Sequence, residues 1–88
     1  MQGMKCKLKV DTSSNIVAKR YIVATSGLIH SRELGKLNYK VCVDHIEDET
    51  AILPIPVPEE MSLVVHAFGS IVAWPKNLIV LDDLEVLN

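Results

Sequence analysis

Three segments of the chain alternate apolar and polar residues with a period of two, and this feature constrains the fold most. The segment KCKLKV at 5–10 has lysine at every second position, and YKVCVDHI at 39–46 alternates in the same way. The segment IVAKRYIVA at 16–24 is rich in β-branched residues and follows a polar turn cluster, DTSSN. Period-two alternation is typical of strands with one face in the core and one in solvent. The pattern predicts a hairpin of 5–10 with 16–24, joined by a five-residue loop, and a third strand at 39–46.

The second half of the chain changes its pattern at the prolines. Residues 51–58, AILPIPVP, predict an extended segment, because each proline fixes its own φ and restricts the residue before it. Apolar residues at 61, 64, 65 and 68 then have the spacing of one helix face. Pro58 suits the first turn of a helix and Gly69 suits the residue just past its end. The spacing predicts a helix over about 58–68, a strand at 70–74 and a last strand or docked segment at 77–81.

The predicted fold class is α+β: a small, mostly antiparallel β-sheet or partly open barrel of about 4–6 strands with one short helix at about 58–68. The length of 88 residues fits a single domain. We assign residues 1–4 to an N-terminal extension, 5–80 to the domain and 81–88 to a C-terminal tail. Residues 28–38 predict only a short turn.

The sequence predicts an intracellular protein that does not enter a membrane. No apolar run approaches the roughly 18 residues that span a bilayer. The N-terminus also lacks the continuous apolar stretch of a signal peptide. Cys6 and Cys42 are therefore expected as reduced thiols.

No motif in the sequence indicates catalysis or metal binding. The closest metal-like spacing joins Cys42 to His45, without a second pair, and on a strand these positions face opposite sides. Neither a nucleophile elbow nor a glycine-rich phosphate loop is present. We expect no enzymatic activity, no metal and no cofactor.

Charge is distributed unevenly along the chain. Residues 1–44 carry eight basic and three acidic residues, a net +5, whereas 45–88 carry one basic and eight acidic residues, a net −7. Either folding mixes the two halves, or one of them binds a partner of opposite charge.

The basic half contains a candidate nucleic-acid surface that would act by counterion release. Its residues are Lys5, Lys7, Lys9, Lys19 and Arg20. The sequence pI of about 5.8 and the presence of only two tyrosines argue against this interpretation. The same lysines would protect an edge strand against sheet-to-sheet pairing.

Trp74 has two interpretations. Alternation places it on the core face of its strand, buried beside Val65 or Phe68 of the predicted helix. The rival interpretation makes it an exposed anchor for a partner, as aromatic hot-spot residues are. Together with the apolar tail residues Leu81 and Leu84, it forms the candidate partner-binding set.

A series of short motifs runs from Cys6 to Val80. The chain contains a Cys-x-Leu strand, a Val-Ala-Lys segment, an Ile-His step, a Val-x-Val strand, a Leu-Pro-x-Pro segment and an Ala-x-Gly-x-x-Val-x-Trp-Pro ending. In this series the sequence resembles a small uncharacterised domain of plant CACTA-type (En/Spm-like) transposon proteins and of host proteins derived from them. The matching residues are Cys6, Leu8, Val17, Ala18, Lys19, Ile29, His30, Val41, Val43, Leu53, Pro54, Pro56, Ala67, Gly69, Val72, Trp74 and Pro75. The chain departs at Arg20 and Ser31, where that pattern has glycine.

The resemblance implies a nuclear plant protein and an accessory module rather than a transposase catalytic core. The leading hypothesis is a non-catalytic module for protein interaction or self-association, with a homo-oligomer as one outcome. The alternative is an accessory nucleic-acid-binding surface on the strand face of Lys5, Lys7 and Lys9.

Overall fold

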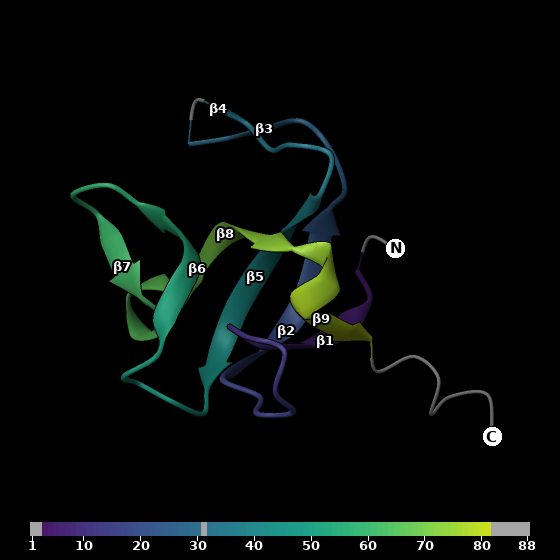
Figure 1. Cartoon of the computed structure of the whole chain (residues 1–88). Helices are drawn as coiled ribbons and strands as arrows, with labels where there is room; N and C mark the ends of the chain where they lie inside the picture. Colours follow the sequence, from purple (N-terminus) through teal and green to yellow (C-terminus); the bar gives the residue numbers. More distant parts are fainter. Residues whose placement is uncertain (1–2, 31, 82–88) are drawn as a thin grey trace, which may run out of the picture.

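A computed structural model describes residues 3–30 and 32–81 (Figure 1). Its largest unit is an antiparallel five-stranded sheet in the order β8-β5-β2-β1-β9. These strands are β1 (Lys5–Leu8), β2 (Ala18–Ala24), β5 (Asn38–Ile46), β8 (Ser70–Pro75) and β9 (Ile79–Leu81). Two small hairpins pair β3 (Leu28–Ile29) with β4 (Arg32–Glu33), and β6 (Ile52–Val57) with β7 (Met61–Leu63). Two 3-10 turns complete the fold, η1 (Val64–Ala67) and η2 (Lys76–Leu78).

The strands predicted from alternation are present. β1 pairs with β2 in a register that places Lys7 opposite Lys19 and Cys6 opposite Arg20. The β1–β2 connection runs from residue 9 to 17 and is longer than the five residues predicted. The proline-rich segment is extended, as predicted, and forms β6.

The predicted helix at 58–68 is wrong, and with it the α+β class. Strands make up 55% of the described residues and helical turns 9%, and no helix of seven residues or more occurs among them. The protein is therefore mostly β. The partly open barrel is also not formed, because the five-stranded sheet is open and ends at β8 and β9.

A hairpin turn replaces the start of the predicted helix. The N–H of Glu60 donates to the carbonyl of Val57 at 3.0 Å, and Glu59 has a φ of 65°. Proline followed by a residue with positive φ is the pattern of a type II turn. The chain then returns along β6, with Met61 opposite Val57. An isolated helix of about eleven residues is marginal in water, so the pairing of β7 with β6 prevails.

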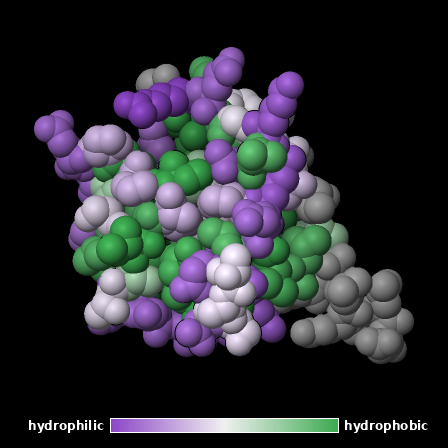
Figure 2. Space-filling model, in the orientation of Figure 1, coloured by the Kyte–Doolittle hydropathy of each residue, from purple (hydrophilic) through white to green (hydrophobic). Residues whose placement is uncertain are grey.

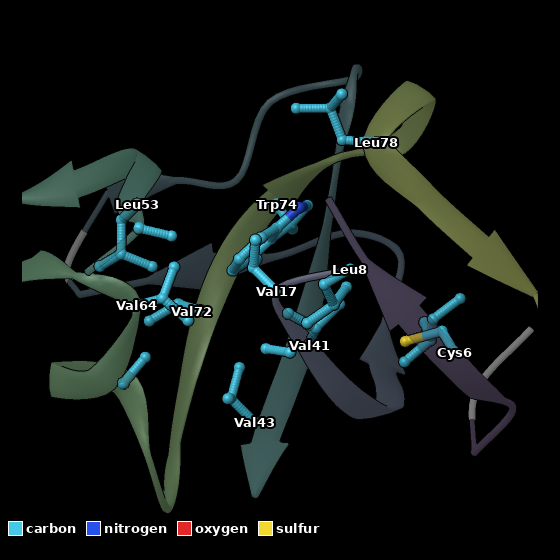
Figure 3. Close-up of a cluster of buried hydrophobic side chains, with 14 residues drawn as sticks. Cys6, Leu8, Val17, Val41, Val43, Leu53, Val64, Val72, Trp74 and Leu78 are labelled. Atoms are coloured by element: carbon cyan, nitrogen blue, oxygen red, sulfur yellow. The ribbon is translucent and has the colours of Figure 1, made fainter. Parts of the chain in front are cut away.

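The core lies between one face of the large sheet and the layer formed by β6 and η1 (Figure 3). The largest fully buried side chains are Trp74, Leu8, Ile22, Leu53, Val41, Val43, Val64, Val72 and Cys6. Leu53 comes from β6 and Val64 from η1, whereas Trp74 comes from β8. The opposite face of the sheet carries the lysines of β1 and β2.

The predicted burial of Trp74 is confirmed, since its exposed fraction is 0%. Its Nε1 donates to the carbonyl of Lys9 at 2.8 Å, which ties the end of β8 to the segment after β1. The helix expected beside it is absent, and Phe68 is instead 60% exposed. Gly69 has a φ of 76° and follows η1, so it ends a 3-10 turn rather than an α-helix.

Candidate interaction site

β8 is an edge strand of the sheet, and its sequence SIVAWP contains no charged residue. The N–H of Lys76 donates to the carbonyl of Leu37 at 2.8 Å, in the register that places Asn38 opposite Pro75. Alternate residues of an antiparallel strand direct their peptide groups to opposite sides. The peptide groups of the even-numbered residues in β8 therefore face β5, and those of the odd-numbered residues face away from the sheet.

Ile71 and Ala73 thus form an unpaired edge. No backbone hydrogen bond joins either of them to a described residue on that side. Ile71 is 42% exposed, while Ala73 is 7% exposed and lies on the floor of a groove. Pro75 has no N–H, so the series of donors ends there. β8 consequently has two donors and two acceptors without a backbone partner, at the surface for Ile71 and within the groove for Ala73. The strand also lacks the charges that usually protect a sheet edge.

The groove beside this edge has a volume of about 460 Å³. It lies between the β3–β4 hairpin and the tip of the β6–β7 hairpin, which project separately in Figure 1. Ile55, Pro56 and Val57 form an apolar wall, and Glu59 and Glu60 lie at the hairpin tip. Figure 2 shows apolar surface over β6 and β7, with strongly hydrophilic residues gathered around β3 and β4.

Of the three predicted partner-binding residues the structure describes two, Trp74 and Leu81, and these two do not form an exposed surface. Trp74 is fully buried and offers no contact to a partner in this fold. Leu81 lies opposite Cys6 in the pairing of β9 with β1, and it packs against the core. Leu84 lies outside the described residues. The exposed apolar residues near β8 are instead Phe68 and Ile71.

The predicted basic residues are only partly brought together. Lys7 lies opposite Lys19, and Lys5 lies opposite Tyr21, so all four share the face of the sheet that points away from the core. Tyr21 is 39% exposed. The Nζ of Lys19 lies 3.3 Å from Oε2 of Glu47, and this hydrogen bond lowers the pKa of the Glu47 carboxyl.

Arg20 and Lys9 lie elsewhere. Arg20 is opposite Cys6 and therefore on the other face of the sheet, where its Nε donates to the carboxylate of Asp44. This hydrogen bond raises the pKa of Arg20. Lys9 follows the end of β1. The structure thus keeps Lys5, Lys7 and Lys19 on one face of the sheet, whereas Arg20 is on the other face and Lys9 lies beyond the strand.

The thiols and histidines are not assembled into a site. Cys6 is buried in the core, and Cys42 pairs with Tyr21 on the outer face, so the sheet separates them. Within residues 3–30 and 32–81, no three His, Cys, Asp or Glu side chains group closely enough to hold a metal ion. No helix in the same ranges is long and apolar enough to cross a bilayer.

These features define a small, open antiparallel β-domain with an unpaired sheet edge beside a groove. Residues 1–82 match the family described as Domain of unknown function (DUF8039), and the chain belongs to this family. The match includes the predicted extension at 1–4. Neither a curated protein nor a solved structure gives a significant match.

Proposed function

We propose that this domain is a non-catalytic protein-interaction module that binds an extended segment of another protein chain at the edge of β8. The observation that carries the proposal is the unpaired edge of Ile71 and Ala73 on a strand without charge. Strand addition supplies affinity through backbone hydrogen bonds and specificity through alternate side chains. The exposed side chains of Ile71 and Phe68 add apolar surface close to this edge.

We also propose an origin and a location in the cell for this protein. The motif series from Cys6 to Val80 supports a nuclear plant protein derived from a CACTA-type transposon. Expressed in plant cells with a fluorescent tag, the full-length protein should accumulate in the nucleus. Exclusion from the nucleus would count against this assignment.

A peptide-display selection tests the edge. Wild-type protein is used for selection, and the variant Ile71→Pro for counter-selection. Proline removes the donor that faces away from β5 and leaves the β5–β8 ladder intact. The control is Ile52→Ser, which changes another exposed apolar residue, on β6.

We expect peptides that bind wild type and the control but not Ile71→Pro, and their binding should shift the amide NMR signals of β8. Sedimentation of the wild type over a range of concentrations shows whether a second copy uses the same edge. Failure to recover any peptide that depends on Ile71, together with a monomeric mass throughout, would refute the proposed function.

A second candidate function rests on Lys5, Lys7 and Lys19 around the exposed ring of Tyr21. An aromatic ring among cations on a sheet face is the arrangement that binds single-stranded nucleic acids. If the candidate is correct, an oligonucleotide of about 12 nucleotides should bind, and its affinity should fall steeply between about 50 and 200 mM salt. Changing the three lysines to Gln should abolish binding, whereas Lys36→Gln serves as the control. Binding that survives the triple change would exclude this face.

A further inference from the structure

The groove beside β8 has features that select one kind of peptide. It is continuous with the unpaired edge, because Ala73 belongs to both. A segment paired with Ile71 and Ala73 would therefore have its end in the groove. The volume of about 460 Å³ lies within the range of ligand pockets in proteins.

The wall opposite the edge is rigid and has few donors. In β6, residues 54 and 56 are prolines, and Pro58 follows the strand, so alternate positions lack an N–H. The fixed φ of each proline also limits movement of this wall. Binding there would cost little conformational entropy, because the wall is already in place. The wall therefore offers apolar contact and leaves the backbone hydrogen bonds of a bound segment to β8.

The rim of the groove is acidic. Glu59 and Glu60 lie at the tip of β6–β7, and neither forms an ion pair with another described residue. Across the groove, the positive charge of Arg32 and the negative charge of Glu33, both in β4, cancel. With His30 neutral, the charged residues that line the groove have a net charge of −2.

We propose that the groove binds an extended peptide with alternating small or β-branched residues that ends in lysine or arginine. The alternating part pairs with Ile71 and Ala73, and the basic end lies beside Glu59 and Glu60. This inference rests on the proposed function and adds the chemistry of the partner.

Two synthetic peptides provide the test, and both carry blocked ends. One is Thr-Val-Thr-Val-Thr-Lys-Lys, and the other replaces both lysines with Glu. Each is titrated into the labelled protein while heteronuclear NMR follows the amide signals. The lysine peptide should shift the signals of Ile71, Ala73 and Glu60, and it should bind at least about five-fold more tightly than the glutamate peptide.

Variants separate the contribution of the rim from that of the edge. The double change Glu59→Gln and Glu60→Gln should remove the preference for lysine and leave the weaker binding at β8. The control Glu49→Gln neutralises an exposed acid in the β5–β6 turn and should leave the preference unchanged. Ile71→Pro should abolish binding of both peptides. Added salt should reduce the preference, since exposed charge pairs are screened.

Several outcomes would overturn the inference. They are equal binding of the two peptides, a preference that persists in the Glu59 and Glu60 variant, no binding of the lysine peptide at millimolar concentration, or a wild-type dimer that Ile71→Pro dissociates. If the display selection yields Ile71-dependent peptides without basic residues, the proposed function stands and this inference fails.

Discussion

Replacing Trp74 with alanine should unfold a large share of the protein. The side chain is fully buried in the centre of the core, and its Nε1 donates to the carbonyl of Lys9. Loss of a buried tryptophan typically costs about 3–5 kcal/mol. A domain of this length has a free energy of unfolding of about 4–13 kcal/mol. Urea denaturation followed by circular dichroism should therefore show a transition shifted strongly to lower urea, or no folded baseline.

Two further variants separate packing from hydrogen bonding. Trp74→Phe keeps an aromatic ring but leaves the Lys9 carbonyl without its donor, and we expect a loss of about 1–2 kcal/mol. Phe68→Ala removes an aromatic side chain that is 60% exposed, and it should cost less than about 1 kcal/mol. Wild-type tryptophan emission should be blue-shifted and resistant to iodide. Red-shifted emission, easy quenching and a Trp74→Ala variant as stable as Phe68→Ala would refute the buried position.

Three smaller predictions concern a turn, a carboxylate and the thiols. Gly69→Ala should destabilise the protein by about 1 kcal/mol in urea denaturation, because the φ of 76° at this position is unfavourable for alanine. The cost comes from the backbone alone, since no atom lies within 4 Å of the added Cβ. An unchanged midpoint would contradict this. Hydrogen bonds from Thr50 lower the pKa of the Asp48 carboxyl below its ordinary value of 3.8. The contribution of Asp48 to the free energy of unfolding is therefore complete above pH 3.8, and it is lost as the pH falls from 3.8 through the lower pKa of the folded state. The difference in stability between wild type and Asp48→Ala should shrink over this acidic range, and a constant difference would be the contrary result. In thiol titration without denaturant, Cys42 should react rapidly and Cys6 only on unfolding, because Cys6 is 1% exposed; two rapid thiols would place Cys6 outside the core.

The strands of the large sheet were predictable because each needs only a local pattern. Alternation in β1 and β5 reports one buried and one exposed face, and the structure has both strands. The β6–β7 hairpin was not predictable in the same way, because Pro58 is equally suited to the first turn of a helix and to the second position of a type II turn. The deciding feature is the positive φ of Glu59, which a glutamate side chain does not favour. Pairing between β6 and β7 therefore overrides the local spacing.

The candidate basic surface was likewise predictable only where a local pattern was sufficient. Alternation alone predicted that Lys5 and Lys7 share a face, and the register confirms it by placing Lys5 and Lys7 opposite Tyr21 and Lys19. Alternation also places neighbouring residues on opposite faces, so Arg20 could have been separated from Lys19 by sequence alone. The position of Tyr21 beside the lysines required the register, which depends on strand pairing across the chain.

The edge of β8 could not be predicted, because its sequence is typical of a different position in a sheet. An uncharged run such as SIVAW usually forms a central strand, where both edges are paired and both faces are covered. Here the same run has β5 on one side and two unpaired peptide groups on the other. Edge strands are usually protected by lysine or proline. β8 has no lysine, and its one proline stands at its end, so the groove beside β6 is what partly covers the strand, at Ala73. Pairing with another chain would satisfy the peptide groups of Ile71 and Ala73, and for this reason we place the interaction at this edge rather than at the lysine-bearing face.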